Sequence, residues 1–129
     1  MSYDLVALVD GRPSTDDILA ALSAGGDELG VIAVSDGAVV QLCAPDNEPL
    51  VSVELPILIQ VPGEVERMLG PAVGVVETPA WWVEIRATAQ EGAREIAEKY
   101  ADTLIERLGG KVWTAEGVRT LADATEGTD

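Results

Sequence analysis

The feature that most constrains the fold is an Asp-Gly pair at residues 36–37, which separates two apolar runs. The run before it reads Val-Ile-Ala-Val-Ser, and the run after it reads Ala-Val-Val-Gln-Leu. A two-residue hairpin turn needs positive φ at both central positions, and Asp-Gly supplies this readily. The sequence therefore predicts a β-hairpin within residues 30–43. Two residue pairs are expected to face each other across it: Val34 with Val39, and Ala33 with Val40.

Further strands are expected on both sides of this hairpin. Residues 4–9 are a short apolar run, and residues 111–114 close the ordered part of the chain. Residues 50–61 are a longer run in which Pro56 predicts a bend or bulge, because proline cannot donate to the strand ladder. Residues 81–87 alternate between two sides of a strand, which predicts one covered and one open face.

Helix signals occur at three places. Ser14 is a suitable N-cap for a first helix, which a Gly-Gly pair ends. Residues 63–69 predict a short second helix. The longest helix is expected to begin at a capping box made by Thr88 and Glu91 and to run to about Leu108.

The predicted order of elements is β-α-β-β-β-(α)-β-α-β, which is typical of the α+β class. We expect a mostly antiparallel sheet of five to six strands with two main helices packed on one face, in a loosely ferredoxin-like arrangement. Residues 1–114 are predicted to form a single α+β domain. Residues 115–129 are predicted to be a polar acidic tail that is partly disordered.

Three of the predicted strand segments are apolar on both faces, at residues 5–9, 31–42 and 57–61. A sheet with one wet face alternates instead. The short helix, the tail or a second copy of the chain must therefore cover the second face. The sequence favours a homodimer through a sheet face, because an uncovered apolar face is prone to association.

The charge of the chain restricts its partners. Eight basic residues against 23 acidic ones give a net charge of −15. Such a protein repels nucleic acid and anionic membrane surfaces, so we expect it to bind neither. The acidity is either a general surface property that keeps the chain soluble or a docking face for a basic protein partner. Residues 1–60 hold ten acids and a single base, Arg12, so a docking face is expected to come mostly from the first half.

The chain lacks histidine, which is the commonest metal ligand and the commonest general base. Cys43 is its one cysteine, which is expected to be a buried structural thiol. We therefore expect no catalytic residue, no metal ion and no cofactor. Residues 1–10 do not resemble a signal peptide, and the apolar runs are shorter than a membrane span, so a cytoplasmic location is expected.

Two groups of acidic residues are weaker candidates for chemistry. Glu54 and Glu84 are strand acids that face away from apolar neighbours, and a carboxylate pair can perform acid–base work in a cleft. Solvated or ion-paired side chains explain them as well. Asp10, Asp16 and Asp17 flank the first strand–helix turn, where carboxylates can hold magnesium, but turn and capping chemistry accounts for all three.

The candidate binding residues are Trp82, Glu84, Arg86 and Trp113. Trp82 shares the polar side of its strand with Glu84 and Arg86, and an open tryptophan is a common interface anchor. Trp113 lies on a neighbouring element and is expected to share the environment of Trp82. The simpler explanation for Trp82 is burial beneath the tail or a helix.

Together these observations favour a non-enzymatic, acidic protein-interaction domain. Its concrete form is an inhibitor or immunity-type protein that masks a basic partner. The alternative is a small-molecule-binding or enzymatic α+β domain with a pocket between the sheet and the helix at residues 90–108. A deep apolar pocket with convergent polar groups favours this alternative, whereas a flat acidic surface favours the interaction domain.

Overall fold

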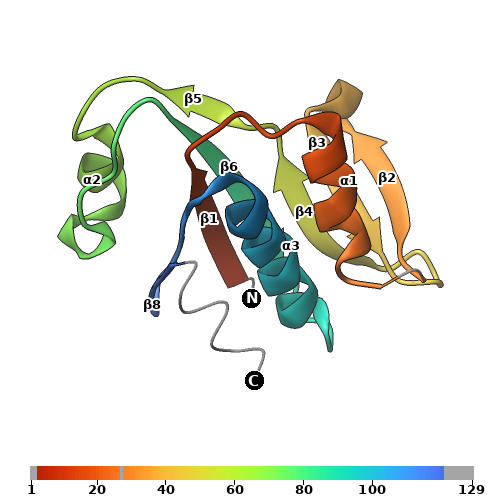
Figure 1. Ribbon diagram of the computed structural model, residues 1–129. Helices are drawn as coiled ribbons and strands as arrows, with labels where there is room; N and C mark the ends of the chain where they lie inside the picture. The colour runs from red at the N-terminus through yellow and green to blue at the C-terminus, as the bar shows by residue number, and fades with distance from the viewer. Residues whose placement is uncertain (1–2, 27, 121–129) are drawn as a thin grey trace.

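The computed structural model describes residues 3–26 and 28–120 and shows an α+β fold built on one antiparallel sheet (Figure 1). In chain order the elements are β1 (Tyr3–Val9), α1 (Thr15–Ser23), β2 (Gly30–Val34), β3 (Val39–Cys43), β4 (Pro49–Glu54), β5 (Ile57–Ile59), α2 (Glu64–Leu69), β6 (Ala80–Ala87), α3 (Ala93–Leu108), β7 (Gly110–Thr114) and β8 (Gly117–Thr120). The strands lie in the order β2-β3-β4-β6-β1-β7-β8, and β5 pairs with β6 beside β4. The predicted class and the mostly antiparallel sheet are thus confirmed.

The predicted hairpin forms with the expected register. Val34 lies opposite Val39 and Ala33 opposite Val40, between β2 and β3. The turn is a single 3-10 turn at Ser35–Gly37, and all three of its residues have positive φ. The Asp-Gly pair therefore fixed which residues of the two strands face each other.

The two faces of the sheet are covered differently. α1 and α3 lie side by side on one face, where α3 packs on the inner side chains of β1, β4 and β6 and α1 packs against α3 (Figure 1). The largest buried residues of this main core include Leu5, Ile85 and Leu104. On the opposite face, Val65 of α2 and Val73 of the following 3-10 turn (Pro71–Val73) pack on one end of β1. The short helix is therefore one covering of the second face.

α1 begins as its sequence predicts. The Ser14 hydroxyl accepts a hydrogen bond from the Asp17 N–H (3.2 Å), and the Asp17 carboxylate accepts one from the Ser14 N–H (2.8 Å). This reciprocal capping box satisfies two backbone donors that would otherwise be unpaired. The Asp17 carboxylate also accepts a hydrogen bond from Arg107 of α3 (2.8 Å), so the cap joins the two helices.

The start of α3 differs from the prediction. The helix begins at Ala93 after Gly92, which has a φ of 83° and no side-chain cap, so the expected capping box of Thr88 and Glu91 does not form. Instead, the Thr88 N–H donates to the Leu50 carbonyl (2.9 Å), and its hydroxyl donates to a neighbouring carbonyl of β4. Pairing with β4 thus continues past the end of β6 and keeps Thr88 out of the helix.

In the part of the chain that the structure describes, the sheet contains eight strands rather than five to six, for two reasons. Pro56 divides the expected strand at residues 50–61 into β4 and β5. Residues 117–120, assigned from sequence to the polar tail, form β8, in which Val118 lies opposite Trp113. The rest of the predicted tail, residues 121–129, lies outside the described residues, and the ferredoxin-like likeness stays a prediction. No helix in the described part of the chain is long and apolar enough to cross a membrane.

Candidate functional site

The predicted binding residues lie on the sheet face opposite α1 and α3. Trp82, Glu84 and Arg86 alternate along β6, and their intervening neighbours Val83 and Ile85 belong to the main core. Trp113 of β7 lies on the same face as Trp82, because each packs against the small core beneath α2. The structure therefore places these four residues on one face of the sheet.

The two tryptophans are half-buried rather than open. Trp82 lies opposite Leu8 across the β1–β6 pairing, and Trp113 lies opposite Val6 across the β1–β7 pairing. Both pack against the apolar cluster made by β1 and the α2 region. A large part of each indole therefore stabilises the fold, and its remaining surface is what a partner can reach.

Glu84 and Glu54 lie side by side on the open face. The β4–β6 register pairs Val53 with Ile85, so Glu54 and Glu84 occupy the next cross-strand position. The neighbouring Glu54 carboxyl, and to a lesser extent partial burial, raises the pKa of Glu84 above its ordinary value. Arg86 forms its ion pair with Asp4 (3.0 Å) and therefore does not fully neutralise the two glutamates. The two glutamates are therefore a place where a cation would relieve repulsion.

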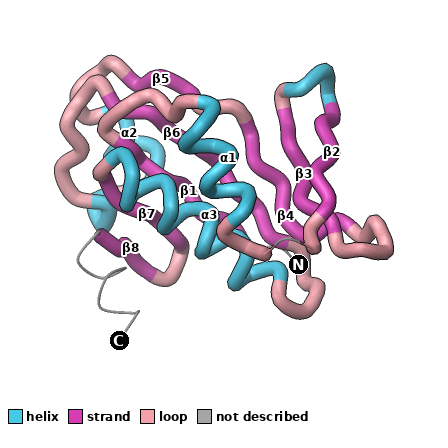
Figure 2. Tube along the Cα trace, turned by 45° about the vertical axis from the view of Figure 1, so that its right-hand side comes forward, coloured by secondary structure: helices cyan, strands magenta, loops and turns pink. Residues whose placement is uncertain are grey.

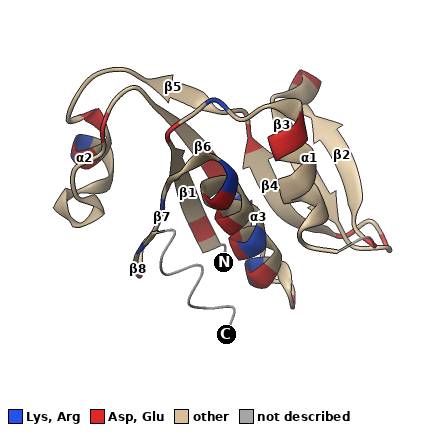
Figure 3. Cartoon of the chain, in the orientation of Figure 1, with Lys and Arg blue, Asp and Glu red and all other residues tan. Residues whose placement is uncertain are grey.

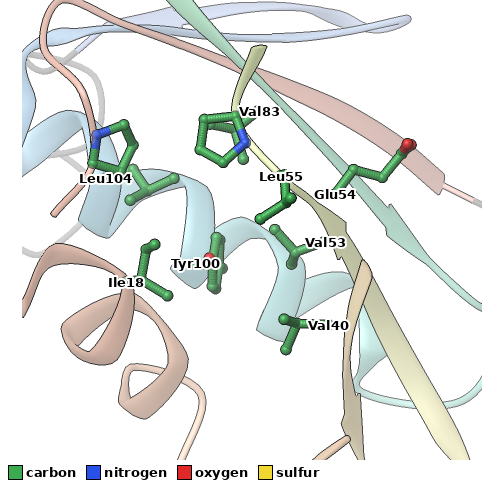
Figure 4. Close-up of a pocket in the computed structure, with 10 residues that line it drawn as sticks. Ile18, Val40, Val53, Glu54, Leu55, Val83, Tyr100 and Leu104 are labelled. Atoms are coloured by element: carbon green, nitrogen blue, oxygen red, sulfur yellow. The ribbon is translucent and has the colours of Figure 1, made fainter. Parts of the chain in front are cut away.

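A cavity does lie between the sheet and α3, where the alternative function places a pocket (Figure 4). Its walls include Ile18 of α1, Val40 and Val53 of the sheet, and Tyr100 and Leu104 of α3. Its volume is about 40 Å³, against the roughly 300–1,000 Å³ typical of ligand pockets. Burial raises the pKa of Tyr100 to about 12, so its phenol stays neutral. The cavity is small, apolar and on the wrong face for Trp82, Glu84, Arg86 and Trp113.

The arginines of the second half of the chain, together with Lys111, are engaged in local contacts. Every arginine after residue 60 forms an ion pair with an acidic residue: Arg67, Arg86, Arg94, Arg107 and Arg119. Lys111 donates from its ammonium group to the carbonyls of Val73 and Val75. Figure 3 shows basic and acidic residues interleaved along α3. Little positive charge is therefore left to balance acids elsewhere.

The acids of the first half are mostly without such partners. Asp4 and Asp17 pair with arginines, but in the described chain seven other acids of this half have no basic side chain within 4 Å. These are Asp10, Asp16, Glu28, Asp36, Asp46, Glu48 and Glu54. Five of them, from Glu28 onward, lie on or beside β2, β3 and β4. We call residues 28–54 the acidic wing.

The outer strand of the acidic wing is apolar and open. Val31 and Ile32 of β2 are 53% and 42% exposed, and Gly30 and Ala33 are exposed as well. Among residues 3–26 and 28–120, β2 pairs with β3 alone and forms an edge of the sheet. Figure 2 shows the β2–β3 hairpin at the margin of the fold, beyond both α1 and α3. An apolar strand is thus displayed between acidic residues.

A groove opens where the acidic wing meets the helices. It has a volume of about 470 Å³ and runs between the end of α1, the β3–β4 connection and the start of α3. Leu29, Pro45, Leu50 and Ile96 contribute apolar walls, and Glu28 lies at its border. The acidic wing therefore combines apolar and acidic surface at more than one place.

The other candidate residues have local roles in the described structure. Asp17 caps α1 and binds Arg107; the Ser14 backbone N–H, then the Arg107 side chain, lowers its pKa to about 2. Asp10 and Asp16 form no metal-binding group with it in the described chain. Cys43 is buried in β3.

The sequence did not single out β2 and its flanking acids as a site. The available signal was that neither face of the predicted hairpin is polar, although one side of an edge strand normally is. Comparison with known proteins gives no match: no family model, no curated protein and no solved structure is significantly similar to the chain.

Proposed function

We propose that this chain is a non-enzymatic, acidic protein-interaction domain that binds a basic protein partner through the acidic wing. An inhibitor or immunity-type protein that masks a basic enzyme is its concrete form. The net charge of −15 favours a basic protein as the partner, and we propose that this partner contacts residues 28–54.

One observation carries the proposal: an exposed apolar strand is framed by acidic residues that no described basic residue neutralises. Val31 and Ile32 lie between Glu28 and Asp36, and all four side chains are exposed. Specific interfaces commonly have an apolar centre and a polar rim. Rim charges of one sign accelerate encounter with an oppositely charged partner and select against wrong ones.

The predicted binding residues extend this surface. Glu54 lies at the end of β4 and adjoins Glu84 on β6, so a partner seated on the open face of the acidic wing reaches Glu84 and Arg86 next. A lysine or arginine of the partner placed between Glu54 and Glu84 would relieve their mutual repulsion. Trp82 and Trp113 lie farther along the same face and offer apolar contact at its border.

Capture from the native lysate with charge-matched bait proteins tests this function. The first variant, Glu28→Gln/Asp36→Asn/Glu54→Gln, removes three acids of the acidic wing. The matched control, Glu91→Gln/Glu95→Gln/Glu106→Gln, removes three exposed acids on or just before α3. Wild-type and control baits are expected to retain the same basic protein at low salt, and the first variant is expected to lose most of it.

The salt dependence of capture provides a second criterion. Retention of the basic protein is expected to fall steeply between about 50 and 300 mM salt, because exposed charges are screened over roughly 10 Å or less in this range. Two results would contradict the proposal. One is equal loss of the partner from both triple variants, and the other is capture of an uncharged or acidic partner that salt does not weaken.

A further inference from the structure

We infer that the partner binds by adding an extended strand to the free edge of β2, and that this strand is apolar at its centre and basic at both ends. The inference rests on the proposed function and deepens it, since it states the partner's local structure and sequence pattern. Three features of the acidic wing support it: the open edge of β2, the apolar side chains on both of its faces, and the acids at its ends.

β2 differs from the other margins of the sheet. β8 at the opposite margin is four residues long, and its Arg119 forms an ion pair with Asp102 (2.9 Å), which places a charge at that edge. β5 has only three residues. β2 has five residues, Gly30–Val34, with no charge, no proline and no bulge. Short strands, charges and bulges are the devices that block edge pairing, and β2 has none of them.

The free edge offers a backbone of useful length. Five residues of strand span about 17 Å, and every other residue directs its N–H and C=O groups away from β3. Peptides that add to a sheet edge gain affinity from such groups and specificity from alternate side chains. β2 can therefore hold a short extended segment without any change in the fold.

Both faces of β2 offer apolar contact to an added strand. Val31 and Ala33 lie opposite Leu42 and Val40, on the side of α1 and α3. Ile32 lies opposite Gln41 on the other face and is 42% exposed. Side chains of an added strand would continue both rows. Apolar residues would be buried on the side of Val31 and Ala33, and a β-branched residue such as threonine can pack beside Ile32, whose row already includes the polar Gln41. This defines the apolar centre of the partner segment.

The charges at the two ends of β2 define the rest of the pattern. Glu28 lies just before the strand and Asp36 just after it; both are exposed, and neither has a basic neighbour within 4 Å in the described residues. A segment with lysine or arginine on both sides of its apolar centre meets an acid at each end. Its orientation along β2 does not matter for this complementarity.

A second copy of the chain fits this edge less well. Antiparallel pairing of two β2 strands about a two-fold axis at Ile32 places Glu28 of each copy opposite Asp36 of the other. Like charges directly opposite each other on neighbouring strands are destabilising. Each copy also carries a net charge of −15. The acids thus disfavour self-pairing and select a basic segment.

A set of peptides separates strand addition from general attraction. The probe is a labelled peptide, Lys-Lys-Val-Thr-Val-Thr-Val-Lys-Lys, and its binding to the full chain is measured by fluorescence anisotropy at low salt. Two further peptides carry N-methyl groups either on the three valines or on the two threonines. In an added strand only one of these sets faces β2. One methylated peptide is therefore expected to bind at least about tenfold more weakly than the other, as the loss of two or three hydrogen bonds implies.

Protein variants and hydrogen exchange locate the added strand. Ile32→Arg is expected to abolish binding. Met68→Arg, which introduces the same charged side chain at an exposed residue of α2, is expected to leave binding within about twofold. The peptide is also expected to slow exchange at alternate amides of Gly30–Val34. Equal binding of the two methylated peptides, or exchange that changes nowhere on β2, would overturn strand addition.

The same experiments distinguish this failure from failure of the proposed function. If binding is sensitive to salt but the two methylated peptides bind equally, strand addition is contradicted and the proposed basic partner is not. Absence of peptide binding up to millimolar concentration would also contradict strand addition. Alternating protection of β2 that appears without peptide and grows with protein concentration would identify a second copy as the occupant and overturn the inference.

Discussion

Neutralising Glu84 is expected to stabilise the protein at neutral pH, although the substitution removes a charged side chain from a folded strand. Glu84 lies beside Glu54, and the nearby Glu54 carboxyl raises its pKa. Residues in such cross-strand positions have Cβ atoms about 4.5–5.5 Å apart. Two unit charges 4 Å apart repel by about 1 kcal/mol in water and about 4 kcal/mol at an effective dielectric constant of 20. Because Glu84 is partly exposed, solvent screening places the effect at about 0.5–1 kcal/mol.

The sign of the pH dependence follows from the raised pKa. The folded state holds the Glu84 proton more tightly than the unfolded chain, where the pKa is near 4.5. The stability that this proton contributes is present below about pH 4.5 and is lost as pH rises through the folded pKa. Glu84→Gln is therefore expected to be more stable than wild type at pH 7 and nearly equal to it at pH 3.

Urea unfolding at pH 3 and pH 7 measures this difference, with Glu91→Gln as a matched control at an exposed position outside the sheet. The double variant Glu54→Gln/Glu84→Gln is expected to gain less than the sum of the single variants, because each single change already removes the shared repulsion. A Glu84→Gln variant that is less stable than wild type at pH 7, or strict additivity in the double variant, would refute this reasoning.

Three further predictions concern the elements that hold the fold. Ser14→Ala removes the N-cap of α1 and is expected to cost about 1 kcal/mol of unfolding free energy, measured by urea unfolding; an effect near zero would contradict the cap. Asp17→Asn is expected to lower the thermal midpoint at pH 7 and to lower it much less at pH 2. The reason is that a carboxylate whose pKa is lowered to about 2 loses its contribution as pH falls from its usual pKa through that value. Leu104→Ala is expected to cost about 2–5 kcal/mol at a fully buried site, whereas Leu19→Ala, at a residue that is 54% exposed, should cost well under 1 kcal/mol.

Local sequence patterns predicted the parts of the fold that local physics determines. The Asp-Gly pair fixed the register of β2 and β3 because its turn geometry allows few alternatives. Ser14 predicted the start of α1, since its capping contacts involve only residues 14–17. The alternation of β6 correctly separated Trp82, Glu84 and Arg86 from the main core.

Long-range pairing produced what local patterns could not predict. Thr88 has the sequence of an N-cap, but hydrogen bonds to β4, almost forty residues earlier, keep it extended. β8 depends on pairing with β7 and on the contact of Arg119 with Asp102 of α3, neither of which its own composition reveals.

The candidate site was only partly visible from sequence for a related reason. The charge asymmetry located the acids in the first half of the chain, but their lack of basic partners depends on where the arginines fold. The edge position of β2 depends on the strand order, because β1 pairs with β6 and β7 rather than with β2. The apolar character of β2 on both faces suggested a covered strand, whereas the structure leaves it open.

The location of binding is the central claim, and backbone amide chemical shifts test it most directly. The basic-ended peptide is added at low salt to isotope-labelled protein, and shift changes are mapped onto the described residues. We expect the largest changes within residues 28–54, centred on β2. Changes concentrated around Trp82 and Trp113, with β2 unaffected, would contradict the account.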